Sequence, residues 1–443
     1  MNSALMVAFH YPPCSRGSGV HRTLSFSRHL PGHGWRPLVL SAHARAHEWT
    51  NEDQLGQVPA DAIVRRAFAL DARRHLAVGG RYLKVTALPD RWITWWLGAL
   101  PAGLRLFRTH RPAVIWSTFP IATAHLIGLT LHRLTRTPWV ADFRDPMTEP
   151  GFPRDVTTRR FLIRIEASVV RHAARLIFAT ETARQTYLQR YPTLSADRCL
   201  TIANGYEEED FRGLVEAAED PAAAGTFRLL HSGLIYPEER DPMPLFRALA
   251  RLKREGQLAN PSLRLELRAP GFEARYASVV DQMGLSDVVY VLPGTTHREA
   301  LRDCASASGL LLLQGPTCNA QIPAKTYEYL RIGRPILALT PAGSDTAAVL
   351  EECGGATRVD PLDEESIYRG VPAFIRSVQI GAHPLPDPAS TIRYARHTHA
   401  GRLAACFSEV ARRVPASTAG PGFLRRQGSS PGRASQPGGR REL

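Results

Sequence analysis

Residues 322–339 read IPAKTYEYLRIGRPILAL, a short helical pattern followed by an apolar run. Pro323 suits the first helical position, where its missing N–H costs nothing, and Gly333 suits the position just past the helix end. Residues 335–339 predict a parallel strand that is covered on both faces. The stretch therefore predicts a helix and a buried strand of an α/β fold.

Two charged side chains, Lys325 and Glu328, lie three residues apart and therefore on one face of this helix. A helix start attracts phosphate, because it offers bare N–H groups and the positive end of a dipole. A lysine strengthens such a site, and a carboxylate one turn later can accept hydrogen bonds from ribose hydroxyls. This arrangement suits a sugar nucleotide. The same spacing also fits a solvated ion pair worth roughly a few tenths of a kcal/mol.

The rest of the chain alternates short apolar runs with longer helical stretches, which predicts parallel sheets with helices on both faces. The eleven expected strands are too many for one doubly wound sheet, so two domains fit better. The clearest helical patterns cover residues 20–30, 157–174 and 243–254. The expected strands are residues 5–9, 37–40, 114–118, 139–143, 176–180, 200–203, 227–231, 263–267, 288–292, 309–313 and 335–339.

The joint between the domains is expected at residues 207–226, which are acidic, poor in strand formers and followed at once by a strand. We therefore assign residues 1–207 to a first domain and 208–388 to a second. A final helix over about residues 389–414 can fold back across the first domain. Residues 415–443 are rich in Gly, Pro, Ser and Gln, and we expect a disordered basic tail.

The 443-residue chain is 44% hydrophobic and 22% charged, as is ordinary for a globular protein, and carries a formal charge of +14. The charge suggests a polyanionic partner, an anionic membrane face or phosphorylated ligands. Nucleic-acid binding is not favoured, because part of the charge lies in the tail. The chain shows no cysteine pair with metal-site spacing, no evident signal peptide and no apolar run long enough to span a membrane. We expect a cytoplasmic protein that is soluble or, at most, peripheral.

Ligands of open parallel sheets bind beyond the carboxyl ends of the strands, so the loops after strands form the candidate site. Gly17 and Gly19 follow the first strand and let the backbone approach a phosphate closely, although a plain turn explains them equally well. Asp142 and Asp145 follow another expected strand. Their carboxylates can serve acceptor hydroxyl groups or position a leaving group, whereas a helix cap paired with the intervening arginine is the structural alternative.

The second domain offers a similar rim. Gly233 follows its first strand and permits close backbone approach. Arg240 precedes the next helix and can hold a diphosphate through two hydrogen bonds, although a surface arginine is the simpler interpretation. The loop at residues 293–299 lies on the same expected rim. In the first domain, the pair Asn204-Gly205 predicts a turn with positive φ.

In this order along the chain, the residues resemble the GT-B glycosyltransferases, specifically a bacterial, mostly retaining, nucleotide-sugar-dependent group with two facing Rossmann-like domains. The resemblance covers residues 1 to about 414. It rests on residues 10–13, 17–22, 29–30, 34–35, 142–146, 202–206, 231–236, 240, 294 and 323–335.

The resemblance implies two doubly wound α/β domains that enclose a cleft, in which a sugar passes from a nucleotide diphosphate donor to a cell-envelope polysaccharide or glycolipid acceptor. Arg240 and Lys325 match the cations that hold the donor diphosphate, and Glu328 matches the carboxylate that binds the ribose. Backbone around Gly17 and Gly19 faces the donor phosphates or the acceptor. No metal and no cofactor are expected, because cations and a helix N-terminus neutralise the departing diphosphate.

One position departs from the family pattern. The family often has a further glutamate ahead of the ribose-binding one, in contact with the transferred sugar, and Ala320 stands at that position here. Two alternatives therefore stay open: a sugar-nucleotide epimerase on the same fold, and a non-catalytic carbohydrate- or lipid-binding scaffold.

Two segments mix aromatic, apolar and basic residues, namely residues 91–97 and 159–164. Such amphipathic surface can rest on anionic lipid at the inner membrane face, where lipid-linked sugars are built. Helix packing within the core explains the same composition, so both interpretations are carried forward.

Overall fold

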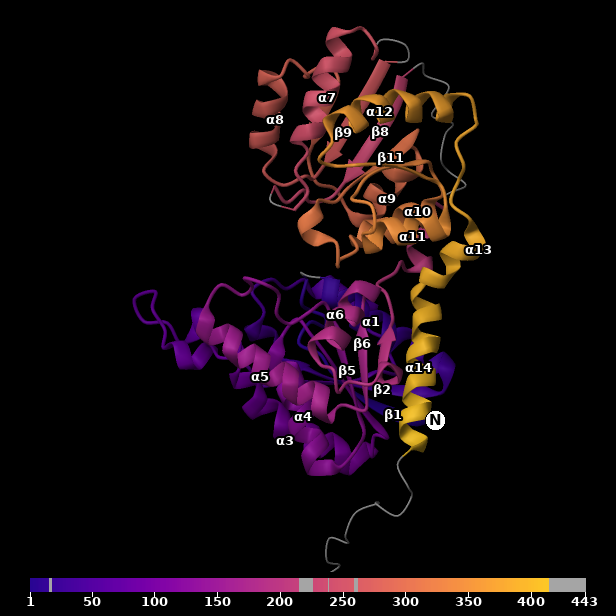
Figure 1. The fold of residues 1–443 in the computed structure, drawn as a ribbon. Helices are drawn as coiled ribbons and strands as arrows, with labels where there is room; N and C mark the ends of the chain where they lie inside the picture. The colour runs from indigo at the N-terminus through magenta and orange to yellow at the C-terminus, as the bar shows by residue number, and fades with distance from the viewer. Residues whose placement is uncertain (16–17, 215–225, 238, 259–261, 414–443) are drawn as a thin grey trace, which may run out of the picture.

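The computed structural model describes residues 1–15, 18–214, 226–237, 239–258 and 262–413 of the chain. Within these ranges the named strands form two sheets, and every pair of neighbouring strands runs parallel. Figure 1 shows the two domains stacked, with the first domain below the second. The predicted α/β class with two parallel-sheet domains is confirmed.

The first sheet has seven strands in the order β3-β2-β1-β4-β5-β6-β7. The order reverses between β1 and β4, and ligands of open parallel sheets bind at such a switch point. The strands are β1 Asn2–Val7, β2 Trp35–Ala42, β3 Ile63–Ala67, β4 Val114–Thr118, β5 Trp139–Arg144, β6 Arg175–Phe178 and β7 Cys199–Thr201.

Helices cover both faces of this sheet, because successive side chains of a strand point to opposite faces. Along β1, Leu5 enters the core formed with α3, α4 and α5, whereas Met6 enters the core formed with α1 and α14. The helices of the first domain are α1 Ser18–His29, α2 Ala72–His75, α3 Thr94–His110, α4 Ala122–Thr135, α5 Val156–His172 and α6 Glu181–Arg190.

The second sheet has six strands in the order β10-β9-β8-β11-β12-β13. One face packs against α7, α8 and α12, and the other against α9, α10 and α11. The strands are β8 Thr226–Ser232, β9 Ser262–Arg268, β10 Val289–Leu292, β11 Gly309–Leu313, β12 Ile336–Leu339 and β13 Ala356–Val359. The helices are α7 Met243–Arg254, α8 Glu273–Gln282, α9 His297–Ala305, α10 Ala324–Ile332, α11 Asp345–Cys353 and α12 Glu364–Gln379.

The chain passes between the domains at two places that lie side by side. Tyr206 and Ala395 form a parallel bridge, so the outgoing and returning segments are paired. The expected final helix is broken into α13 Pro388–Thr391 and α14 Arg396–Arg412, with a short 3-10 turn between them. Figure 1 shows α14 running along the first domain, and its Leu403 and Phe407 enter that domain's core. The expected tail at residues 415–443 lies outside the described residues.

Two strands were missed by the sequence analysis, β3 and β13, and each forms an edge of its sheet. Another correction concerns Gly205, whose φ is not positive. A Cβ atom there would lie 2.0 Å from the carbonyl oxygen of Tyr394, so the glycine is needed for close packing of the two crossing segments. Among the described residues, no helix has both the length and the apolar character needed to cross a membrane.

Candidate functional site

A cleft of about 620 Å³ lies between the two domains, with walls from both and from the start of α14. Sites for small molecules and cofactors commonly have volumes of about 300–1,000 Å³. The second domain contributes a polar wall that includes Ser232, Gly233, Arg268, Thr295, His297, Lys325 and Glu328. The first domain and α14 contribute His21, Arg22, Phe26, Asn204 and Arg396 among others, and Asp210 lies just after the crossing into the second domain.

Helix α10 brings its N-terminal turn to this cleft. It starts after Pro323 and ends at Gly333, which has φ 78°. Its buried side chains Tyr327 and Leu330 pack against the second sheet, whereas Tyr329 lines the cleft beside Lys325. Lys325 and Glu328 both line the cleft, so the helical face predicted from their spacing is the face that a ligand would meet.

The Lys325 ammonium lies against a buried histidine. Its Nζ atom is 2.9 Å from Nε2 of His231, whose Nδ1 atom is 2.9 Å from the carbonyl oxygen of Leu311. Burial and the neighbouring Lys325 charge hold the pKa of His231 well below its usual value, so the ring is neutral. Its Nδ1–H then donates to the carbonyl, and its Nε2 accepts from the lysine.

Gly233 lies beside this lysine. Its φ of 96° is unfavourable for other residues, and a Cβ atom there would lie 3.4 Å from Lys325 Nζ. Burial and the charge of Arg240 lower the pKa of Lys325 to about 7. A bound anion would relieve both effects, so the site is suited to phosphate.

Glu328 lies one turn further along α10. Burial raises the pKa of its carboxyl group, and the charges of His297 and Arg396 offset part of that effect. His297 Nε2 is 3.8 Å from Glu328 Oε1 and 3.5 Å from Asp210 Oδ2. The carboxylate thus faces the cleft near cationic groups, without a close hydrogen bond that would block access to it.

Arg240 does not line the cleft in this arrangement. Its Nη1 atom donates to the carbonyl oxygen of Leu234 over 3.3 Å, and its guanidinium lies 5.3 Å from the centre of the Tyr236 ring. Its charge nevertheless acts on Lys325, so the two cations are neighbours.

On the first-domain wall, Asp142 is fully buried and bonded to Arg22. Arg22 Nε is 2.8 Å from one carboxylate oxygen and Arg22 Nη2 is 3.2 Å from the other. The same guanidinium donates to the carbonyl oxygens of Ile202 and Ala203, each over 2.9 Å. Asp142 therefore holds Arg22, and through it the loop after β7, at the cleft.

Asp145 differs from Asp142, because its carboxylate makes no hydrogen bond or ion pair with the residues that the structure describes. Burial raises the pKa of Asp145, and the charges of Arg144 and Arg22 offset part of the effect. Gly19 lies close to the Arg144 side chain, since a Cβ atom on the glycine would be 2.8 Å from Nη1 of Arg144. Gly17 lies outside the described residues.

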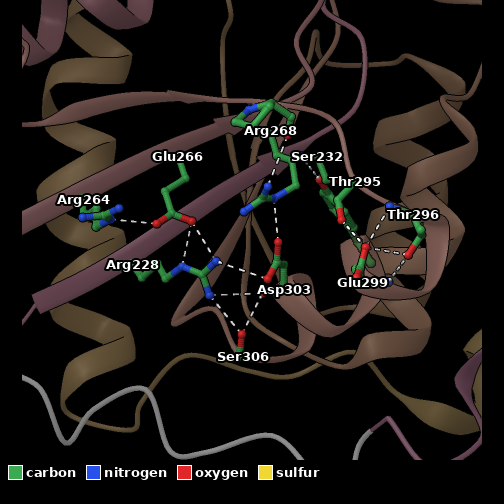
Figure 2. Close-up of polar contacts among 12 residues, drawn as sticks. Arg228, Ser232, Arg264, Glu266, Arg268, Thr295, Thr296, Glu299, Asp303 and Ser306 are labelled. Carbon is green, nitrogen blue, oxygen red and sulfur yellow. Dashed lines mark hydrogen bonds and ion pairs between the residues drawn. The ribbon is translucent and has the colours of Figure 1, made fainter.

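The sequence analysis missed Arg268 at the end of β9. Its Nε atom is 2.6 Å from Oδ2 of Asp303, and Nη1 donates to the carbonyl oxygen of Pro293 over 3.2 Å. Figure 2 shows how this ion pair continues through Arg228 to Glu266. Nothing in the sequence indicated its partner Asp303 on α9.

The position of the missing family glutamate is a contact between the domains. Thr180 Oγ1 of the first domain donates to the backbone oxygen of Ala320 over 2.8 Å. Across the described ranges, no group of three or more His, Cys, Asp or Glu side chains is placed to hold a metal ion.

Comparison with known proteins agrees with this arrangement. Residues 16–205 match the family described as glycosyl transferase 4-like domain. Among curated proteins, no sequence is significantly similar to the chain.

Several solved structures have the same fold over their full length. HepE from Anabaena, solved in complex with UDP, aligns with a TM-score of 0.60 at 15% identity, over 92% of this chain and 100% of that one. Sucrose-phosphate synthase from Thermosynechococcus elongatus aligns with a TM-score of 0.58 at 14% identity, over 93% and 99%. Trehalose 6-phosphate synthase from Burkholderia multivorans aligns with a TM-score of 0.60 at 14% identity, over 93% and 97%.

At these identities the structural likeness shows the fold, which is the two-domain GT-B architecture. The chain therefore has the GT-B fold, and the match of residues 16–205 to a glycosyl transferase domain supports glycosyltransferase activity.

Proposed function

We propose that the protein transfers a sugar from a nucleotide diphosphate donor to a cell-envelope polysaccharide or glycolipid, without a metal ion and with retention of configuration. The observation that carries the proposal is the start of α10, where Lys325 and Glu328 both face the cleft beside Gly233. The related fold of HepE was solved with UDP, which supports a nucleotide donor for this chain as well.

In this proposal, the donor diphosphate lies at the α10 N-terminus. The helix dipole, Lys325 and the adjacent Arg240 stabilise the negative charge that develops as the diphosphate leaves. These positive groups take the place that a metal ion has in other transferases. Glu328, one turn along the helix, accepts hydrogen bonds from the ribose hydroxyls. Backbone at Gly233 and at Gly19 allows close approach of the donor or the acceptor.

The acceptor side falls to the first domain, where Asp142 and Asp145 are the candidate catalytic carboxylates. Asp145 has the freer carboxylate, so it is the group proposed to orient or deprotonate the acceptor hydroxyl. Asp142 acts through Arg22, which it holds at the cleft.

Asp145→Asn tests this assignment. Transfer to an acceptor is expected to fall by about a hundredfold, as for loss of a general base, while donor binding stays unchanged. Transfer is measured by release of the nucleoside diphosphate, and donor binding by calorimetry. Full activity of the variant would remove Asp145 from the mechanism. The configuration of the product, read by NMR, tests retention separately.

The donor proposal is tested on the full chain by calorimetry and thermal shift with UDP-, GDP- and ADP-sugars. At least one of these is expected to bind and to raise the melting temperature, and an acceptor extract is expected to trigger release of the nucleoside diphosphate. If none binds, the transferase proposal fails and the non-catalytic scaffold gains support. Release of an epimerised free nucleotide sugar would instead favour the epimerase.

A lipid-linked acceptor requires contact with a membrane, and the first domain carries a suitable surface. The apolar–basic surface consists of residues 78–85 and residues 152–164, which an ion pair between Lys84 and Asp155 joins. Val78, Leu83 and Val85 are exposed by 85%, 74% and 70%. The second segment adds exposed Phe152, Val156, Phe161, Ile163 and the basic Arg160 and Arg164.

The two amphipathic segments named from the sequence differ in exposure. Trp95 is fully buried, and Trp92 and Trp96 pack against the same core, so the aromatic residues of the segment 91–97 mainly support the fold. In the segment 159–164, in contrast, Leu162 is buried but four side chains of α5 are exposed, namely Arg160, Phe161, Ile163 and Arg164. We therefore propose the apolar–basic surface as the membrane contact at the cytoplasmic face.

Vesicle binding tests this contact. The protein is expected to sediment with vesicles that contain phosphatidylglycerol and less with neutral phosphatidylcholine vesicles. The double variant Leu83→Glu, Val85→Glu should lose most of this binding. Leu362→Glu is the matched control, because Leu362 is 70% exposed on the second domain. Equal binding by all three proteins would contradict the assignment of the surface.

A further inference from the structure

The second-domain wall of the cleft runs from the proposed ribose site at Glu328 past the β10–α9 loop to Arg268. Glu328 Oε1 lies 3.8 Å from His297 Nε2, and His297 opens α9 directly after the β10–α9 loop. Pro293 of that loop accepts a hydrogen bond from Arg268 over 3.2 Å. Thr295, Arg268 and Ala269 all line the cleft. A nucleobase attached to a ribose at Glu328 can therefore extend along this wall toward Arg268.

Arg268 is fixed in orientation although it lies at the cleft. Its side chain is 17% exposed, and its Nε atom is 2.6 Å from Asp303 Oδ2. Asp303 also lies 3.9 Å from Arg228, which in turn binds the buried Glu266 over 2.7 Å. Figure 2 shows this chain of ion pairs from β9 to α9. These contacts thus hold a guanidinium that lines the cleft.

A guanidinium donates hydrogen bonds and cannot accept them. It therefore suits a base edge that presents carbonyl oxygens, as in uracil, thymine and guanine. The adenine edge instead presents an amino group next to a ring nitrogen, which an arginine matches poorly.

We propose that Arg268 is a specificity-determining residue that selects donors whose base carries a carbonyl oxygen over adenine donors. The proposal rests on the proposed function, because it takes the diphosphate and ribose to lie at Lys325 and Glu328. Asp303 is a positioning residue in this account, since it acts on the base only through Arg268.

The test compares dissociation constants of UDP, GDP and ADP, which share the diphosphate and the ribose. The unmodified protein is expected to bind UDP or GDP roughly tenfold more tightly than ADP. Arg268→Met should remove this preference by weakening the carbonyl-base nucleotide while ADP changes little. Arg268→Gln should shift the preference toward ADP, because a glutamine amide matches the adenine edge.

Arg264→Met is the matched control, since Arg264 lies four residues earlier on β9, binds Glu266 over 2.7 Å and does not line the cleft. It should leave all three dissociation constants unchanged. Equal weakening of all three nucleotides by Arg268→Met, or tight ADP binding by the unmodified protein, would overturn the inference about the base. Failure of every nucleotide to bind would instead overturn the proposed function itself. If Arg268→Met does not fold, the Arg268→Gln measurement alone decides, because a purely structural role cannot exchange one base for another.

Discussion

The two walls of the cleft use their charged side chains differently. On the first-domain wall, Arg22 is neutralised by Asp142 and by backbone carbonyls, so its bonds hold that domain together. On the second-domain wall, Lys325 contacts the neutral ring of His231, and Glu328 has no ion pair closer than 3.8 Å with any residue that the structure describes. A charge without a close counter-charge is available to a ligand. The contrast supports the proposal that the second wall holds the donor, whereas the Arg22–Asp142 pair maintains the shape of the first.

The largest effect is expected from a substitution in the first wall that lowers the free energy of unfolding. Asp142→Ala leaves Arg22 buried without its counter-charge, and loss of one partner of a buried pair costs about 3–5 kcal/mol. We therefore expect a large drop in the free energy of unfolding, measured by urea denaturation followed by tryptophan fluorescence.

The control for Asp142→Ala is an exposed ion pair in the same domain. Glu48 is 3.0 Å from Arg91, and its side chain is 45% exposed. Glu48→Ala should change the free energy of unfolding far less, because an exposed ion pair contributes little to stability. If the two variants were equally stable, Asp142 would not hold the first wall together, and its carboxylate would be open to a direct catalytic role.

The next effect tests the second wall. Lys325→Met removes the cation at the start of α10 and should weaken nucleoside diphosphate binding by about tenfold to a hundredfold, because hydrogen bonds to charged groups contribute about 1.5–3 kcal/mol. Stability should stay the same or rise, since burial of the ammonium lowers its pKa and thus opposes its charged form. Calorimetry with UDP measures the loss.

Lys253→Met serves as the control for Lys325→Met, because Lys253 lies on α7 and pairs with Asp287 away from the cleft. It should leave UDP binding intact. A Lys325 variant that bound UDP as well as the unmodified protein would erase the difference between the two walls.

A smaller effect is expected at the ribose position. Glu328→Gln keeps the size of the side chain but replaces one acceptor oxygen by a donor, and should weaken UDP binding by about threefold to tenfold. The comparison of UDP with its 2′-deoxy form sharpens the assignment. The unmodified protein should prefer UDP, and the variant should discriminate less. An unchanged preference would place the ribose elsewhere.

Most of the fold was predictable from the sequence, because buried parallel strands read as continuous apolar runs. The run of leucines in β11 illustrates this, since all of its side chains are buried. The two missed strands, β3 and β13, pair on one side only and carry arginines, so their composition resembles that of loops.

The candidate site was predictable only where one short segment holds it. Lys325 and Glu328 share a helical face, so their spacing alone placed them together. Arg268 depends on Asp303 from another element, and a single sequence contains no signal for that pair. The ion pair of Asp142 was likewise not predictable, because its partner Arg22 lies far away in the sequence, in α1 near the N-terminus.

The smallest effect concerns the proton on Lys325. In the free protein its pKa is lowered to about 7, and a bound diphosphate should raise that pKa by favouring the ammonium. Above pH 7 donor binding therefore takes up a proton, and UDP-glucose affinity should fall about fivefold between about pH 7 and pH 8. The linked stability has the same origin: because the unfolded lysine keeps its ordinary higher pKa, this group makes folding more favourable as pH rises above 7. Calorimetry in two buffers of different ionisation enthalpy measures the proton uptake directly. Lys325→Arg, whose side chain stays charged, should bind with no proton uptake, and equal uptake by both proteins would assign the proton to another group.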